Sequence, residues 1–396
     1  MNSFKREMME IIDLTCELVR FKTMHSKPDE IRRCAAYIEH YLKRLGVSWN
    51  RFEYGNSPAV LALPQSNKTP VLLMSHMDVV DAPERLFTPV IHDGKLYGRG
   101  SFDDKYAVAL SLILFKNHLQ RLREQGRGQQ DLPFGILMTG DEEIGGFNGA
   151  KKILPDIEAD FCVVLDGGRI EKIVVKEKGV VSVTLLAAIK PDSGDACRFE
   201  RNALEMLKRD IDRWEVCFVK SVPEHRYRKI ICRSIRPLTF YQGIPDTAQA
   251  QLEIWYTRTD NVERMFFAMQ GELHSKIIID RVEPMFDGGS PEHLKWILDI
   301  SKKTRIGFED GVNDSQFLSR FGIKGVVWGA NGDHSQHTHN EHVSIESIYE
   351  LYGLLDNFIK RCESKARMCQ DDEKENNKTD FLECKRHSSR YPKGFF

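Results

Sequence analysis

The sequence has no long apolar run near its first residue. Its opening segment, MNSFKREMMEIIDLTCELVRF, alternates charged and apolar residues at helical spacing and predicts an amphipathic helix. A secretory signal or a membrane span would need an uninterrupted apolar core. We therefore expect no membrane association and a cytoplasmic location.

The sequence also lacks a strong net charge. Its 57 Lys and Arg residues nearly balance its 58 Asp and Glu residues, which gives a formal net charge of -1. A protein without excess positive charge has no general attraction for nucleic acid or anionic lipid. We therefore expect neither as a partner, and any active site must be a local feature.

Closely spaced cysteine pairs are absent as well. The nine cysteines are scattered along the chain without CxxC spacing. An odd, dispersed set without a secretory signal is typical of reduced thiols in the cytoplasm. We expect no disulfide bond and no zinc bound by cysteine.

The order of apolar and polar segments predicts an α/β fold. A chain of 396 residues exceeds what one hydrophobic core usually organises, so two domains are expected. Within residues 1–178, apolar strand-like runs are followed by acidic loops and helices, as in LPFGILMTGDEE and DFCVVLDGG. This repeated order predicts a site at the carboxyl ends of the strands.

The pattern changes near Gly179. Residues 179–286 read as strand, helix, strand, strand, helix and strand, which predicts a two-layer βαββαβ unit of the ferredoxin-like kind. We interpret this unit as an inserted second domain. The α/β pattern returns over residues 287–363, whereas residues 364–396 have few apolar residues and mixed charge runs, which predicts a disordered tail.

Five loops that follow strands carry side chains of the kind that bind metals. An isolated acid in such a place more often caps a helix, so the prediction depends on the whole set. Imidazole and carboxylate ligands without thiolate suit a catalytic zinc, cobalt or manganese site with open positions. Two ions about 3.5–4 Å apart need one carboxylate that binds both and further ligands that bind only one ion each. The residues of this set are numerous enough to supply all of these ligands. The residues are His76 with Asp78, Asp103 with Asp104, Glu142 with Glu143, Asp166, and His337.

His76 and Asp78 end the apolar run LLMSHMD. Side chains two positions apart on a strand point the same way. Asp78 can therefore accept the second ring N–H of His76 and hold the ring for a metal. Standing alone, such a pair is more often an ordinary surface pair.

The segments SHMDVV, GRGSFDDK, DEEIGG and HTHNEHV resemble, in this order, the motifs of the co-catalytic zinc peptidase family. That family includes acetylornithine deacetylase, succinyl-diaminopimelate desuccinylase, aminoacylase, carboxypeptidase G and carnosinase-like dipeptidases. The likeness covers residues 8–363. It implies a three-layer α/β catalytic domain whose inserted domain serves as a lid and as a possible homodimer interface.

The resemblance also implies roles for the site residues. His76, Asp103 and Asp166 would hold one zinc ion, and Asp103, Glu143 and His337 would hold the other. Cobalt or manganese in place of zinc remains possible. In the spacing H-x-x-N-E, His337 is the residue that matches the family ligand, and His339 is the alternative.

The reaction that the resemblance implies is hydrolysis of a dipeptide or an N-acyl amino acid. Glu142 would act as general base on a water shared by the two ions and would then pass the proton to the leaving amine. Asp78 would orient His76, and the Asp103–Asp104 peptide bond would be cis. An Asp at position 166, where other members carry Glu, resembles the dipeptidase and aminopeptidase branches.

The predicted lid departs from the family pattern. Family lids usually carry a histidine that donates to the oxyanion, but AAIKPDSGDACRFERNAL contains none, and Ser193 or its neighbours fill that place. A family Asn before IP is Gln242 here. Arg258 is a candidate to bind a substrate carboxylate, with an ordinary surface arginine as the alternative.

Three interpretations therefore remain open. The first is a two-metal amide hydrolase, and the second is a non-catalytic or weakly active family member that keeps the ligands without the lid histidine. The third is a structural α/β protein whose acids cap helices. The order of the five ligand loops favours the first two, and assays with added metal separate them.

Overall fold

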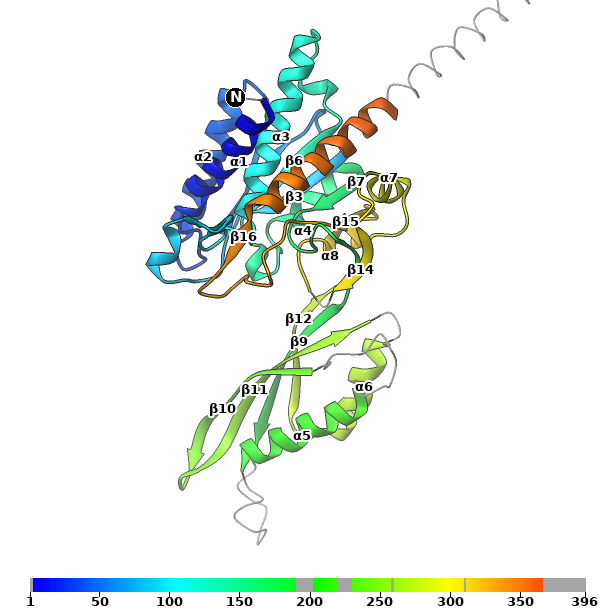
Figure 1. Cartoon of the computed structure of the whole chain (residues 1–396). Helices are drawn as coiled ribbons and strands as arrows, with labels where there is room; N and C mark the ends of the chain where they lie inside the picture. Colours follow the sequence, from blue (N-terminus) through cyan, green and yellow to red (C-terminus); the bar gives the residue numbers. More distant parts are fainter. Residues whose placement is uncertain (1–2, 190–201, 219–229, 258–259, 310, 366–396) are drawn as a thin grey trace, which may run out of the picture. The chain divides into compact units, whose positions relative to one another are not determined.

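The computed structural model describes residues 3–189, 202–218, 230–257, 260–309 and 311–365 (Figure 1). These residues form two compact units. The first comprises the chain up to Ile173, Ser290–Arg305 and the chain from Gly325 onward, and the second comprises Val174–Gly289 and Ile306–Lys324. The predicted insert over residues 179–286 lies within the second unit, whose bounds are wider.

The first unit is built on a mixed sheet in the order β1-β2-β6-β3-β7-β15. Its central strands β6, β3, β7 and β15 are parallel to one another, and β1 and β2 run antiparallel at one edge. Every residue of β2 and β6 is buried, as expected for strands inside an α/β fold. The bounds are β1 (Asn50–Tyr54), β2 (Ser57–Ala62), β3 (Lys68–His76), β6 (Phe134–Thr139), β7 (Glu158–Val164) and β15 (Gly325–Val327).

Helices pack against this sheet through apolar faces. Phe115 and His118 of α3 meet Phe134 of β6 edge to face, and His293 of α7 stacks on Phe161 of β7. The α3 run of buried residues from Lys105 to Phe115 explains its strongly apolar sequence. The bounds are α1 (Ser3–Val19), α2 (Pro28–Arg44), α3 (Lys105–Glu124), α4 (Ala150–Ile153), α7 (Glu292–Ile300) and a last helix over residues 345–365.

A small antiparallel sheet in the order β16-β5-β4 completes the first unit. It consists of β4 (Val90–His92), β5 (Lys95–Tyr97) and β16 (His342–Ser344). Its pairing of His342 with Tyr97 joins two segments that lie far apart in the sequence. The loops before α3 and before β16 are thereby held near each other.

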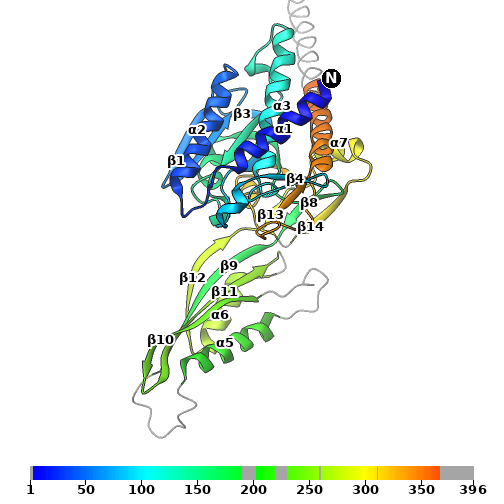
Figure 2. The same cartoon turned by 60° about the vertical axis from the view of Figure 1, so that its left-hand side comes forward.

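The second unit contains a four-stranded antiparallel sheet in the order β10-β11-β9-β12, with α5 and α6 on one of its faces (Figure 2). The chain order is the predicted βαββαβ: β9 (Gly179–Ala188), α5 (Ala203–Phe218), β10 (Ile230–Tyr241), β11 (Ile244–Tyr256), α6 (Val262–Glu272) and β12 (Lys276–Glu283). The unit also contains most of β8 (Lys172–Glu177) and β14 (Arg305–Glu309), together with β13 (Phe286–Asp287) and the short helix α8 (Gln316–Arg320). Strand β8 pairs with β13 and β14.

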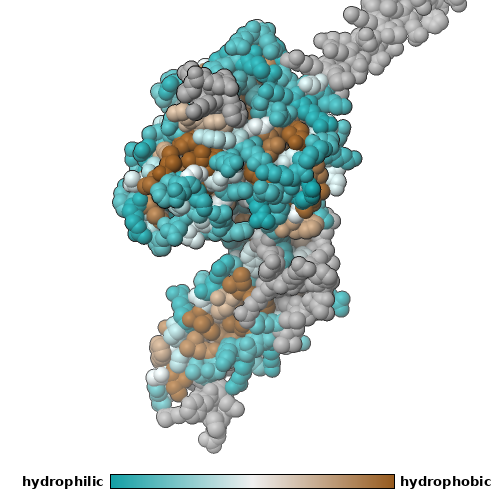
Figure 3. All heavy atoms as spheres, viewed as in Figure 1, coloured by the Kyte–Doolittle hydropathy of each residue, from teal (hydrophilic) through white to brown (hydrophobic). Residues whose placement is uncertain are grey.

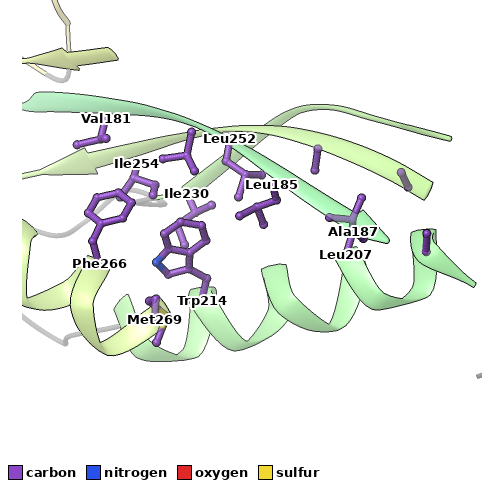
Figure 4. Close-up of a cluster of buried hydrophobic side chains, with 14 residues drawn as sticks. Val181, Leu185, Ala187, Leu207, Trp214, Ile230, Leu252, Ile254, Phe266 and Met269 are labelled. Carbon is purple, nitrogen blue, oxygen red and sulfur yellow. The ribbon is translucent and has the colours of Figure 1, made fainter. Parts of the chain in front are cut away.

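Alternating residues of the four-stranded sheet form a core with the two helices (Figure 4). On β11, Leu252 and Ile254 point into this core, whereas Glu253 between them does not. Trp214 of α5 is fully buried and meets Phe266 of α6 at a ring distance of 5.6 Å. The second unit therefore has a hydrophobic core of its own.

The α/β class and the order of elements are as predicted. The predicted tail over residues 364–396 lies outside the described residues from 366 onward. Among the described residues, Cys16, Cys34, Cys162, Cys232 and Cys362 are free thiols. No described helix is both long enough and apolar enough to cross a membrane.

Candidate metal centre

Three neighbouring parallel strands bring the candidate ligands together. In the order β6-β3-β7, β3 ends at His76, β6 ends just before the acidic loop of Glu142 and Glu143, and β7 ends two residues before Asp166. His76 and Thr139 are directly paired, so the two strands end level with each other. The carboxyl ends of parallel strands are a common position for sites in α/β folds.

Asp103 lies between the two histidines. Its Oδ1 is 2.8 Å from Nε2 of His76, and its Oδ2 is 3.0 Å from Nε2 of His337. Nε2 of His337 is also 3.0 Å from Oε2 of Glu143. One carboxylate thus presents a separate oxygen to each histidine, as a carboxylate shared by two metal ions must do.

Among the described residues, two groups of three side chains could each hold a metal ion. Within each group, the possible ligand atoms lie within 4.8 Å of one another. We call them the His76 cluster (His76, Glu142 and Asp166) and the His337 cluster (Asp103, Glu143 and His337). Nε2 of His76 is 3.8 Å from Oδ2 of Asp166 and 3.9 Å from Oε2 of Glu142. Glu142, which we predicted to be a base rather than a ligand, lies as close to His76 as Asp166 does.

The loop that carries Asp103 is held by a buried glutamate. Oε1 of Glu341 accepts hydrogen bonds from the backbone N–H groups of Gly100, Phe102 and Asp103, at 2.8, 3.2 and 3.2 Å. Arg99 pairs with Oε2 of the same side chain. Both charged groups are almost fully buried, so this arrangement fixes the backbone at the shared aspartate. The Asp103–Asp104 peptide bond is cis, as the resemblance implies.

Asp78 contacts the residues that carry the candidate ligands. Its carboxylate accepts the backbone N–H groups of Glu142 and Glu143 at 3.2 and 3.0 Å. His76 Nδ1 lies 3.4 Å from Oδ1 of Asp78 and 3.0 Å from its backbone oxygen. Asp78 therefore holds the acidic loop as well as the His76 ring, and the backbone oxygen makes the shorter contact to that ring.

The loops of Asp166 and His337 are fixed by other contacts. The hydroxyl of Tyr106 donates to the backbone oxygen of Leu165 at 2.8 Å and accepts from the N–H of Ala330 at 2.9 Å. It therefore ties the end of β7 to the loop after β15. His337 itself has a φ of +61°, in the left-handed region that few residues other than glycine adopt.

The site carries more acidic than basic side chains. Burial and the neighbouring Asp103 raise the pKa of Asp166 to about 7, and the same two causes raise the pKa of Glu143. Hydrogen bonds to Asp103 and Glu143 raise the pKa of His337 to about 10. Crowded carboxylates shift in this direction, and a bound divalent cation would stabilise their ionised forms.

The donor set fits a pair of transition-metal ions. Each cluster offers one imidazole nitrogen and carboxylates from two residues, and Asp103 contacts the histidines of both. Sulfur is absent from both clusters, which is the ligand chemistry of hydrolytic zinc, cobalt or manganese sites.

Three further residues of the sequence analysis are not among the ligands described above. Arg258 and Ser193 lie outside the described residues. Gln242 belongs to the second unit, where Gln242 and Gly243 form the turn between β10 and β11 with φ values of +49° and +80°. Its position is that of a hairpin turn residue, and its predicted contact with substrate stays a prediction.

Sequence reasoning missed three supporting residues. Arg99 lies in the motif GRGSFDDK and Glu341 in HTHNEHV. Each is a charged residue that is not a ligand in a motif that carries one, and this could have indicated their ion pair. His25 contacts Asp78 but lies in a loop without any motif, and nothing in the sequence distinguishes it from an ordinary surface histidine.

A mixed α/β unit with two imidazole and carboxylate clusters joined by one aspartate defines the class of candidate two-metal hydrolases. The profile of peptidase family M20/M25/M40 matches residues 72–361, most of the chain. The chain therefore belongs to this family of peptidases.

The individual relatives described below share less than a third of their residues with this chain over the matched length. Succinyl-diaminopimelate desuccinylase of Xylella fastidiosa (strain M12) is 28% identical over 193 residues, which cover 45% of this chain and 49% of the relative. The match thus spans about half the length of that relative. A tripeptidase structure from Staphylococcus aureus superposes with a TM-score of 0.69 at 20% identity, covering 90% of this chain and 99% of that one.

A second structure is similar at lower identity. It is a Bacillus subtilis protein described as a dinuclear metal binding peptidase of the M20 family, with a TM-score of 0.55 and 11% identity over 90% of this chain and 98% of that chain. At these levels of identity the two structures support the α/β fold alone. The family is metal-dependent, and the two clusters described here are the candidate ligands.

Proposed function

We propose that this protein is a two-metal amide hydrolase that cleaves a dipeptide or an N-acyl amino acid. The observation that carries the proposal is the position of Asp103, which presents one carboxylate oxygen to His76 and the other to His337. A carboxylate shared in this way gives two ions a common ligand and sets their separation.

His76 and Asp166 would be private ligands of one ion, and Glu143 and His337 of the other. When bound, the ions would supply Lewis-acid polarisation of the scissile carbonyl and would lower the pKa of the attacking water. Zinc is the proposed metal, with cobalt or manganese as alternatives that the same donors accept.

Glu142 is the proposed general base. Its carboxylate lies near His76, and its side chain is about one-eighth exposed, so it faces the same space as the ligand atoms while remaining open to a substrate. It would take a proton from the attacking water and donate it to the nitrogen of the leaving amine. Glu143 is less suited, because its two oxygens face His337 and the N–H of Val80.

The substrate class rests on the relatives and on the predicted contacts. The desuccinylase and the tripeptidase are named for N-acyl and peptide substrates, which share a secondary amide next to a carboxylate-bearing carbon. Arg258 is the proposed partner of the substrate carboxylate through a bidentate contact, and Gln242 is a further proposed substrate contact.

A weakly active member of the family is the second candidate. The observation that favours it is the lack of histidine between Ala187 and Leu204, the segment where family lids place their oxyanion donor. Loss of one such donor typically costs about 2.7–4 kcal/mol of transition-state stabilisation. This candidate binds metal but turns over slowly.

The test is a metal and substrate panel. Protein purified without chelator should contain up to two transition ions per chain, and it should hydrolyse at least one of a set of dipeptides and N-acyl amino acids supplied with zinc, cobalt or manganese. His76→Ala and Asp103→Ala should reduce the metal content. A folded protein that takes up no metal would refute the proposal, whereas full metal content with slow turnover would favour the second candidate.

A further inference from the structure

The loop between α1 and α2 is bonded to the loop that follows β3. We call residues 20–27 the α1–α2 loop and residues 77–84 the β3 loop. The hydroxyl of Thr23 donates to the backbone oxygen of Met77 at 2.6 Å, and the N–H of Val79 donates to the backbone oxygen of Thr23 at 3.0 Å. Oγ of Ser26 donates to Oδ1 of Asp81 at 2.8 Å. The two loops therefore form one structural piece.

Apolar packing and a buried lysine fix this piece further. Met24, Val79 and Phe87 form a small buried cluster between the loops. Nζ of Lys105, at the start of α3, donates to the backbone oxygen of Phe21 at 2.6 Å. The α1–α2 loop is thus anchored both to the end of β3 and to the helix that follows Asp103.

Within this piece, His25 reaches the buried carboxylate of Asp78. Nε2 of His25 is 3.0 Å from Oδ2 of Asp78, whose side chain has no exposed surface, whereas the His25 side chain is 26% exposed. An ionised carboxylate only accepts, so Nε2 of His25 carries the hydrogen. Oδ2 of Asp78 also accepts the N–H of Glu143, and Oδ1 accepts the N–H of Glu142.

We propose that His25 is a positioning residue for the metal centre, acting through Asp78. This inference rests on the two-metal function proposed above. By donating to Oδ2, His25 fixes the rotation of the Asp78 carboxylate. That carboxylate in turn sets the direction of the His76 ring and the backbone of Glu142 and Glu143. Partners of this kind typically change metal affinity or activity about 10–100-fold when they are removed.

A direct ligand role for His25 does not fit the geometry. The two groups of described residues that can hold a metal include His76 and His337 but not His25. The ring of His25 instead contacts the carboxylate of Asp78, which is not a candidate ligand. A role confined to joining the two loops is also insufficient, since Thr23 and Ser26 already join them without touching Asp78.

The test compares three variants of the full chain. His25→Leu removes the donor, and His25→Gln keeps an N–H at nearly the distance of the ring Nε2. Ser26→Ala is the matched control, because it removes a neighbouring link between the same two loops without affecting Asp78. The readouts are the apparent zinc dissociation constants from competition with a chromophoric chelator, kcat and KM on the best substrate, and the melting temperature of the metal-free protein.

We expect His25→Leu to raise at least one zinc dissociation constant about 10–100-fold and to lower kcat more than it changes KM. His25→Gln should recover most of the affinity, and Ser26→Ala should match the unaltered protein. Wild-type affinity and kcat in His25→Leu would overturn the inference. The same loss in His25→Gln or in Ser26→Ala would also overturn it, because the hydrogen bond to Asp78 would then not be the cause.

Two further outcomes are an unfolded His25→Leu variant and an unaltered protein that binds no zinc. If His25→Leu does not fold, His25→Asn replaces it, because the shorter Asn amide stops short of Asp78; it should lose affinity relative to His25→Gln, and equal affinity in the two would overturn the inference. If the unaltered protein binds no zinc, the proposed two-metal function fails before any variant is compared. Intact zinc binding by the unaltered protein with an unaffected His25→Leu refutes only the role of His25.

Discussion

Glu142 and Glu143 are adjacent in the chain, yet the site gives their carboxylates different surroundings. The Glu143 side chain is 5% exposed, and its oxygens face His337 and the backbone N–H of Val80. The Glu142 side chain is 12% exposed and lies near His76. Asp78 fixes the backbone of both, so their difference in role must come from where each side chain points.

Exchange of each glutamate for alanine separates these roles. We expect Glu142→Ala to retain both metal ions and to lower kcat about 10²–10⁴-fold, the usual contribution of a general base. Glu143→Ala should lose one ion, because the His337 cluster keeps only two ligands. Metal analysis and steady-state kinetics on the same preparations provide the comparison. Loss of metal in Glu142→Ala with full metal in Glu143→Ala would mean that base and ligand are exchanged.

At this scale, the sequence predicted which candidate ligands lie together better than it predicted the residues that support them. His76, Asp103 and His337 belong to motifs whose order implied a shared site, and the structure places them within hydrogen-bonding distance. The contact of His25 with Asp78 joins residues 53 positions apart and has no sequence pattern. Only the folded packing of the α1–α2 loop on the β3 loop reveals it.

At the scale of elements, long periodic segments were predicted more completely than short ones. The β11 strand alternates buried and less buried residues from Ala248 to Trp255, and β9 is a mostly buried, apolar run of 10 residues, so both give a clear strand signal. In contrast, β5, β13 and β16 have only two or three residues each. Such strands exist because distant partners pair with them, so the local sequence does not specify them.

Trp214 provides the element-scale prediction. It is fully buried between α5, α6 and the four-stranded sheet, so Trp214→Ala should lower the free energy of unfolding of the second unit by about 3–5 kcal/mol. Metal content should not change, because every candidate ligand lies in the first unit. Denaturant unfolding followed by circular dichroism measures the first effect, and elemental analysis measures the second.

Trp214→Phe is the control, since it keeps an aromatic ring opposite Phe266 and should cost less than Trp214→Ala. Equal destabilisation by the two variants would argue against the core packing described here. Loss of metal in Trp214→Ala would show instead that the two units do not fold independently.

At the scale of the whole molecule, the four-stranded sheet leaves an apolar edge exposed. β10 is an edge strand, and hydrophobic side chains gather on the visible surface of this sheet (Figure 3). Natural proteins usually protect such edges, and an exposed apolar surface commonly marks an interaction site. The exposed large hydrophobic residues of β10 are Ile235, Leu238, Phe240 and Tyr241.

We propose that this edge pairs with its copy in a homodimer, as the resemblance implies for the inserted domain. The unaltered protein should then sediment as a dimer. Phe240→Lys should yield monomers, because it places a charge on a 60% exposed apolar position of β10 where two copies would meet. Phe267→Lys is the matched control, since Phe267 is 80% exposed but belongs to α6. Dissociation by Phe267→Lys alone would move the interface to the helical face, and a monomeric unaltered protein would exclude the dimer.

If the dimer forms through β10, Phe240→Lys should leave the metal content of the first unit unchanged, because the candidate ligands His76, Asp103 and His337 all come from that unit.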